Sequence, residues 1–215
     1  MKNSITIGFI AFWVLASSAV FGTQQAPDKI IYNGKVYFSP YIYPLESYFE
    51  KYPDKHPTKY QNTLSSLRRG YIATFEINNN QLYLKDIEII IDDTIVENGR
   101  YKMKWKSVLN EVFPNQDVIK IDWFTGLLDL WDSMCYTIYN YNIILEIDKG
   151  YIIKEKLLKN KEEYKKFEEE QFKAFLKTKE YKKVKRKLKM VGRDSFLQRF
   201  IIKYSSKILV EDDEK

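Results

Sequence analysis

Residues 71–84 read YIATFEINNNQLYL, and this stretch decides the fold. Its first half places an apolar residue at every second position, as a half-buried strand does: Tyr71, Ala73, Phe75 and Ile77. Residues 78–80 are asparagines, which favour a turn, and Leu82 and Leu84 begin a return strand. The alternation then shifts at residues 85–86, which predicts a β-bulge. The stretch therefore predicts an antiparallel hairpin.

Two further hairpins are predicted on either side of this one. Residues 28–40 surround Asn33-Gly34, the strongest two-residue turn signal, and residues 141–157 surround a turn at 148–150. Asn98-Gly99 predicts another turn. Short helices are expected at two places where apolar residues recur at helical spacing beside a proline: residues 44–52 and 106–113.

The character of the chain changes at Asn160, which with Glu163 forms a helix N-cap and capping box. A highly charged stretch follows without glycine or proline as far as Gly192, and it predicts one long helix. Residues 194–210 are amphipathic and fit either a strand or a helix. We therefore expect an α+β fold: a mostly antiparallel sheet built from hairpins, short helices, and a long charged C-terminal helix.

The first residues have the pattern of a secretory signal peptide. Lys2 precedes an apolar run at residues 5–15, and small residues follow at 16–19. We expect an exported protein, periplasmic or secreted; the alternative is an uncleaved N-terminal anchor. The expected organisation has four parts: signal peptide 1–22, α+β domain 23–158, charged helix 159–192, and amphipathic segment with acidic tail 193–215.

The net charge of +6 comes from one short stretch. Residues 23–150 hold 14 basic and 17 acidic residues, whereas residues 177–189 hold eight basic residues and one glutamate. Such a helix can meet an anionic membrane surface or an acidic partner, or it can simply be a solvated face. Nucleic acid is not expected, because an exported protein does not meet it. The candidate residues for an anionic surface are Lys177, Lys182, Lys183, Lys185, Arg186, Lys187 and Lys189.

The residue types exclude several chemistries. The only histidine, His56, lies in a polar loop, and the only cysteine, Cys135, has apolar neighbours typical of a buried thiol. No nucleophile elbow, glycine-rich phosphate loop or metal-ligand motif occurs. We expect neither a metal nor a cofactor, and an enzyme is the less favoured class.

Five residues are the best candidates for a binding site, and aromatic residues crowd the region before them. Exposed-looking charges at strand positions, and a tryptophan beside an acid, single out Arg68, Arg69, Glu76, Asp122 and Trp123. Aromatic side chains are enriched at protein interfaces and stack on sugars, although a biased coding composition also explains their number.

Several stretches resemble a family of bacterial proteins to which no activity is attached. They are PLE at 44–46 with Tyr48-Phe49, LRRGYIATFEI at 67–77 with residues 82–84, residues 112–114, DWF at 122–124 with Gly126, and LEIDKG at 145–150. The resemblance covers residues 28–155 and implies that they form one unit. It implies no catalytic residue, and the signal segment and lysine-rich helix lie outside it.

Three functions fit these features. The favoured one is a non-catalytic exported protein that binds another protein, for example an immunity-type protein that neutralises a toxin in the bacterial envelope. The second is an envelope hydrolase or glycan-binding protein that uses Asp122 and Trp123. The third is peripheral membrane attachment through residues 177–189.

Overall fold

Nine strands form one sheet in the computed structural model of this protein, which describes residues 25–57, 64–97, 100–132, 142–187 and 194–209. The expected signal peptide, Cys135, the Asn98-Gly99 turn and Lys189 lie outside these residues. The strands are β1 Asp28–Tyr32, β2 Lys35–Ser39, β3 Ile72–Asn78, β4 Gln81–Glu97, β5 Arg100–Ser107, β6 Ile119–Lys120, β7 Gly126–Trp131, β8 Asn142–Asp148 and β9 Tyr151–Leu158.

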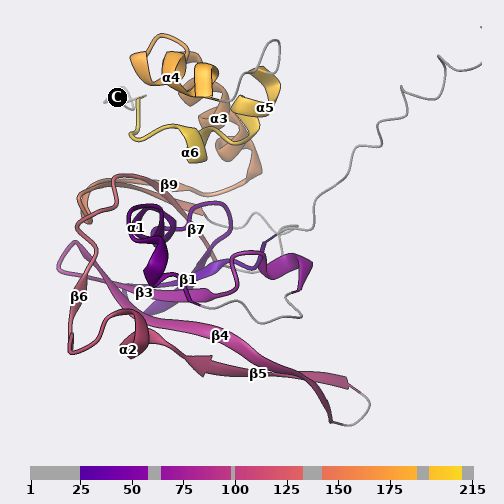
Figure 1. The fold of residues 1–215 in the computed structure, drawn as a ribbon. Helices are drawn as coiled ribbons and strands as arrows, with labels where there is room; N and C mark the ends of the chain where they lie inside the picture. The colour runs from indigo at the N-terminus through magenta and orange to yellow at the C-terminus, as the bar shows by residue number, and fades with distance from the viewer. Residues whose placement is uncertain (1–24, 58–63, 98–99, 133–141, 188–193, 210–215) are drawn as a thin grey trace, which may run out of the picture.

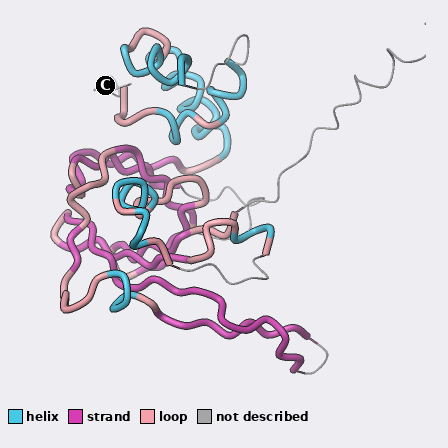
Figure 2. The backbone as a smooth tube through the Cα atoms, viewed as in Figure 1, coloured by secondary structure: helices cyan, strands magenta, loops and turns pink. Residues whose placement is uncertain are grey.

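The sheet closes on itself. Its strand order is β3-β1-β2-β7-β8-β9-β4-β5, and β3 also pairs with β4, so seven strands form a ring while β5 and β6 pair with β4 outside it (Figure 1). Every pairing is antiparallel except that of β1 with β3. The prediction of an α+β fold with a mostly antiparallel sheet is confirmed (Figure 2).

The hairpin at residues 71–84 forms as the sequence predicts. Phe75 pairs with Leu84 and Thr74 pairs with Asp86, so Lys85 is the extra residue of a bulge. Asn79 and Asn80 have φ angles of 49° and 59°, the left-handed conformation of a two-residue hairpin turn. The side chains of Phe75 and its partner on β1, Ile30, are fully buried. Burial of each such side chain stabilises the fold by about 2 kcal/mol.

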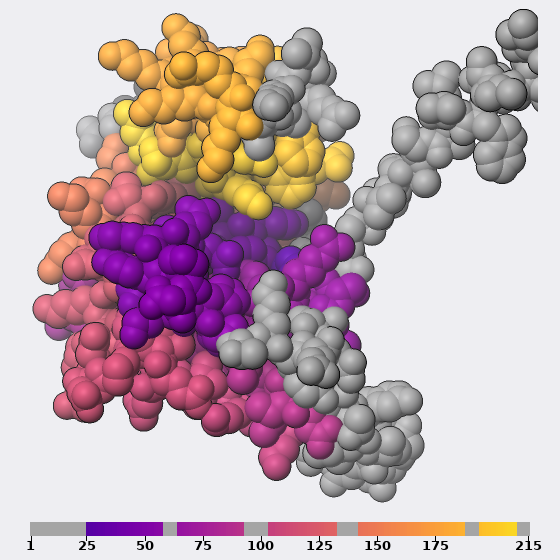
Figure 3. All heavy atoms as spheres, viewed as in Figure 1, coloured from indigo at the N-terminus to yellow at the C-terminus, as the bar shows by residue number. Residues whose placement is uncertain are grey.

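Strand β7 is one of the elements that the sequence did not suggest. All six of its residues are buried, so it lacks the alternation that marks a half-buried strand. The helices that follow β9 explain this burial, because the last of them contacts β7 and Tyr164 of the first donates a hydrogen bond to Asp129 of β7. These helices are α3 Lys161–Phe175, α4 Lys179–Lys187, α5 Asp194–Arg199 and α6 Ile201–Tyr204. They form a separate layer in Figure 3 over the body of the protein, by which we mean the described residues from 25 to 158.

The charged stretch after Asn160 forms two helices instead of one. The Asn160 side chain accepts a hydrogen bond from the Glu163 backbone N–H, so the predicted N-cap is confirmed. Helix α3 ends at Phe175, and the Thr178 hydroxyl then accepts a hydrogen bond from the Tyr181 N–H at 3.1 Å. A threonine in this position caps a new helix, which explains why the chain turns there.

The short helices differ partly from expectation. Helix α1 spans Glu46–Lys51, inside the predicted range, but the second helix, α2, spans only Leu109–Val112. Residues 106–107 belong to β5 because Lys106 pairs with Ile89 of β4. Two short 3-10 helices lie at Pro53–Lys55 and Ser65–Leu67. Of the two alternatives left open for residues 194–210, helix is found over 194–199 and 201–204, where α5 and α6 lie.

Candidate functional site

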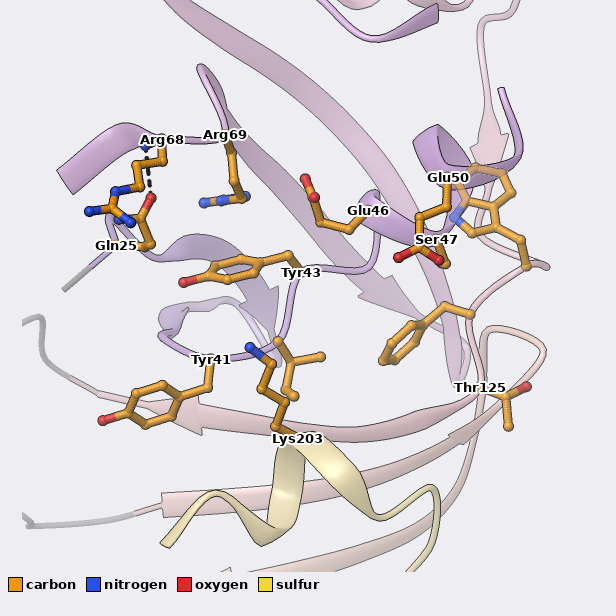
Figure 4. A pocket seen from close by; sticks show the side chains of 13 residues that line it. Gln25, Tyr41, Tyr43, Glu46, Ser47, Glu50, Arg68, Arg69, Thr125 and Lys203 are labelled. Atoms are coloured by element: carbon orange, nitrogen blue, oxygen red, sulfur yellow. Dashed lines mark hydrogen bonds between the residues drawn. The ribbon is translucent and has the colours of Figure 1, made fainter. Parts of the chain in front are cut away.

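A groove of about 690 Å³ lies where α1, the loop after β2 and α6 meet (Figure 4). We call it the aromatic groove; its lining comes from residues 41–43, three residues of α1, residues 123–125, Gln25, Arg68, Arg69 and Lys203. Gln25 and Arg68 lie at one end and Ser47 and Glu50 at the other (Figure 4). A hollow of this size, with aromatic walls and a few charged groups, is typical of a binding site.

The Tyr43 ring is held in a fixed orientation. Its hydroxyl donates a hydrogen bond of 2.6 Å to the Pro40 carbonyl oxygen. The Arg69 guanidinium carbon lies 3.7 Å from the centre of the ring, within the range of a cation–π interaction. Tyr43 therefore forms a fixed wall of the groove, with the Arg69 guanidinium over one face of its ring (Figure 4).

Arg69 is itself anchored inside the body. Its Nη1 lies 2.9 Å from Asp28 Oδ1, and its Nη2 donates to the Ala26 carbonyl oxygen at 2.7 Å. Complete burial raises the pKa of Asp28, while the Arg69 guanidinium acts in the opposite direction. Burial alone would lower the pKa of Arg69, but Asp28 raises it, so the arginine stays charged. The pair is thus a structural support for Tyr43.

Trp123 forms a second fixed aromatic wall. Its indole Nε1 donates to the Pro44 carbonyl oxygen at 3.1 Å. Its ring lies 4.8 Å from the Tyr48 ring and stacks at 6.1 Å on Phe113, centre to centre. Since Pro40 and Pro44 are close in sequence, one loop holds both Tyr43 and Trp123 in place.

Some charged side chains of the groove have a hydrogen-bond partner within the protein and others have none among the described residues. Glu46 accepts a hydrogen bond of 2.6 Å from the Tyr71 hydroxyl, whose pKa is raised by burial and by Asp28 and Glu46. Arg68 and Lys203 are exposed, and within the described part of the chain neither side chain has a hydrogen-bond or ion-pair partner. Lys203 points from α6 into the groove (Figure 4).

The structure gathers three of the five predicted site residues in this groove: Arg68, Arg69 and Trp123. Glu76 lies elsewhere, 3.2 Å from Lys85, in the wall of a second hollow of about 420 Å³. Asp122 is exposed and does not line the aromatic groove. Asp122 and Trp123 are adjacent in sequence, but only Trp123 lines the groove.

Sequence reasoning missed Tyr41, Tyr43, Glu46 and Lys203 as members of one site. The crowding of aromatic residues before residue 60 was a signal for the tyrosines, but it did not tell wall residues from core residues. Lys203 gave no signal, because its place in the groove depends on how α6 packs on the body.

The basic residues of α4 face solvent, while its apolar side chains face inward. Of the predicted anionic-surface residues, Lys177, Lys182, Lys183, Lys185, Arg186 and Lys187 are exposed. Tyr181 and Val184 pack against the core, and the Tyr181 ring lies 5.8 Å from that of Phe175. The apolar side chains of α4 therefore pack within the fold. Only its charged side chains are left for contact with a partner surface.

A buried carboxylate, Asp129, joins α3 to the sheet. It accepts hydrogen bonds from the Trp131 indole at 2.6 Å, the Tyr164 hydroxyl at 2.9 Å and the Asn142 amide at 3.1 Å. Burial raises its pKa to about 6, although the three hydrogen bonds lower it. Burial and the nearby Asp129 raise the pKa of Glu168 to about 7, against the opposing effect of Arg199.

Three further observations concern metal ligands, the histidine and membrane-spanning helices. Within those residues, no three histidine, cysteine, aspartate or glutamate side chains are placed to hold a metal ion. His56 packs against the Phe49 and Tyr71 rings, at 4.8 and 5.7 Å between centres. Across the ranges described, no helix is both long and apolar enough to cross a membrane.

Comparisons with protein-family models, curated proteins and solved structures gave no match for this chain. The function therefore has to be argued from the groove.

Proposed function

We propose that the protein is a non-catalytic binding protein that holds a segment of another protein in the aromatic groove. The observation that carries this proposal is the fixation of Tyr43 and Trp123 by two carbonyl groups of one loop, those of Pro40 and Pro44. Rigid aromatic side chains supply contact area at low entropic cost, which is why binding surfaces favour them.

The distribution of acids favours binding over hydrolysis. Glycoside hydrolysis needs two carboxyl groups that flank one bond, with one of them free to donate a proton. In the groove, the Glu46 carboxylate already accepts a hydrogen bond from the Tyr71 hydroxyl, and Asp122 lies outside. The groove therefore presents Trp123 without Asp122, the acid that the hydrolase hypothesis pairs with it, and Glu50 alone cannot supply both carboxyl groups.

The proposed location and partner follow from the sequence. The signal-like residues 1–22 favour export to the periplasm or the medium, with an uncleaved anchor as the alternative. A protein partner, such as a toxin that an immunity-type protein neutralises, fits an aromatic-walled groove. An anionic membrane surface stays a second candidate for α4, through its solvent-facing lysines alone.

Site-specific photo-crosslinking in the native cells tests the proposal. A photoreactive residue replaces Ser47, which lines the groove, or Lys51, which lies outside the groove on the same helix. We expect one dominant protein adduct from position 47 and none from position 51. Equal adducts from both positions, or no protein adduct from position 47, would overturn the proposal.

A further inference from the structure

The aromatic groove continues into a smaller, third hollow along α6. This hollow, of about 160 Å³, shares Ile42, Phe124, Thr125 and Lys203 with the groove and reaches Glu180 at the start of α4. Together they form a path that begins at Arg68, passes Lys203 and ends beside the basic helix. A path of this form suits an extended chain rather than a compact small molecule.

The charged side chains along this path differ in whether another residue of the protein is bonded to them. Two of its acids are engaged by hydroxyl groups: Glu46 by Tyr71 at 2.6 Å and Glu180 by Ser206 at 3.0 Å. Its cations Arg68 and Lys203 have no partner among the residues that the structure describes. Beyond Glu180, α4 adds exposed basic side chains and no further acid. Glu46 and Glu180 are thus already hydrogen-bonded within the protein, whereas Arg68, Lys203 and the exposed basic residues of α4 are open to an anionic group of a ligand.

The remaining acid, Glu50, fixes the direction of a ligand. It is exposed at the α1 end of the groove, away from Arg68 (Figure 4). An anionic group is repelled there and attracted at Arg68, at Lys203 and beside α4. Acidic residues of a bound chain would thus avoid the α1 end.

The walls of the path add a second requirement. Ile42, Phe124 and Trp123 are apolar or aromatic and line the same groove as the cation Lys203. Successive side chains of an extended polypeptide point to opposite sides, so one segment can present apolar groups to the walls and carboxylates to the cations. A flat anionic surface cannot offer both within a groove.

From these observations we infer that the path from Arg68 to α4 binds an extended segment of a partner protein in which acidic and apolar residues alternate. The inference rests on the proposed binding function and names the chemistry of its partner. The segment would add main-chain and side-chain contacts along α6, and its carboxylates would pair with Arg68 and Lys203.

Selection from a library of random displayed peptides tests the inference on the full chain. We expect enrichment of peptides that carry aspartate or glutamate between apolar residues. A fluorescent copy of the leading peptide is then titrated against the parent protein, Arg68→Glu, Lys203→Glu and the matched control Lys51→Glu, which makes the same charge change outside the groove. Each groove variant should bind at least about tenfold more weakly, and the control should bind as the parent does.

Two further measurements keep the inference falsifiable. Arg68→Gln and Lys203→Gln remove the charge without reversing it, and equal melting temperatures establish that the folds are intact. The inference would be overturned if the selected peptides lacked acidic residues, or if all variants bound the peptide equally well. It would also be overturned if single-stranded DNA or anionic vesicles displaced the labelled peptide as effectively as the unlabelled peptide does. The proposed function survives those results if the adduct from position 47 still forms, and it fails separately if that adduct is absent.

Discussion

Asp28 and Arg69 form an ion pair of 2.9 Å inside the body, with side chains that are 0% and 8% exposed. The same guanidinium supports the Tyr43 wall of the aromatic groove at 3.7 Å. Asp28 also accepts a hydrogen bond from the Ala73 N–H, so one carboxylate joins β1, β3 and the groove. The stability of the fold and the shape of the groove therefore depend on one pair of residues.

Removal of the cation alone should be far more harmful than removal of both charges. Arg69→Met leaves the Asp28 carboxylate buried without its ion partner, and we expect the free energy of unfolding to fall by about 3–5 kcal/mol. The double variant Asp28→Asn/Arg69→Met retains an acceptor for the Ala73 N–H and leaves no buried charge at this pair. It should unfold at a higher urea concentration than Arg69→Met.

The neighbouring arginine supplies the control for this prediction. Arg68 is exposed, and Arg68→Met should change the free energy of unfolding by less than about 0.5 kcal/mol. Equal losses in Arg68→Met and Arg69→Met, or a double variant less stable than Arg69→Met, would show that the buried pair lacks the assigned role.

A second prediction concerns two glycines that share a backbone conformation but differ in surroundings. Gly34 and Gly150 have φ angles of +74° and +82°. A Cβ on Gly34 would meet no atom within 4 Å, so Gly34→Ala should cost about 1–2 kcal/mol for the left-handed backbone. A Cβ on Gly150 would collide with the Ile121 carbonyl oxygen, so Gly150→Ala should cost several times more in a urea titration.

The collision at Gly150 also affects the groove. The Gly150 N–H donates to the Phe124 carbonyl oxygen at 2.9 Å, and Phe124 lines the groove. If Gly150→Ala and Gly34→Ala were equally stable, the close approach of the 148–150 turn to Ile121 would be refuted.

The elements that the sequence predicted are those whose signals are local. The turn at Asn33-Gly34, the bulge at Lys85 and the cap at Asn160 each depend on a few adjacent residues, and all three form. Strand β7 escaped prediction because both of its faces are covered, which removes the alternation. The division of the charged stretch was also missed, because Thr178 was not recognised as a cap.

The site was predictable only in part, for a related reason. Arg68, Arg69 and Trp123 were singled out by residue type, and they do line one groove. Their association with Lys203 depends on the packing of α6 against the ring, a contact between segments far apart in sequence. Hydrophobic periodicity carries no information on such a contact.

A third prediction concerns the break between α3 and α4. Thr178→Ala removes the hydroxyl that accepts the Tyr181 N–H and donates to the Phe175 carbonyl oxygen at 2.7 Å. We expect the free energy of unfolding to fall by about 1 kcal/mol, the usual cost of a lost cap. Thr178→Ser retains the hydroxyl and should stay within a few tenths of a kcal/mol of the parent, as measured by urea denaturation. Equal losses in the two variants would contradict a capping role.

The last prediction concerns pH and the buried Asp129. Burial raises its pKa from 3.8 to about 6, so the folded protein holds this proton more tightly than the unfolded chain does. The contribution of Asp129 to stability is therefore complete below pH 3.8, decreases as pH rises towards 6, and is constant above it. A shift of about two pKa units corresponds to about 3 kcal/mol, and Glu168 acts in the same direction up to about pH 7.

Asp129→Asn isolates this effect because asparagine does not titrate. Its amide oxygen can still accept from Trp131 and Tyr164, and a turned Asn142 amide can accept from its NH₂ group, so the hydrogen bonds survive. Parent and variant are unfolded in urea at several pH values from 4 to 7. The stability of the parent relative to the variant should rise by up to about 3 kcal/mol as the pH falls. A difference that stays constant, or one that falls, would mean that Asp129 is not held in an environment that favours its protonated form.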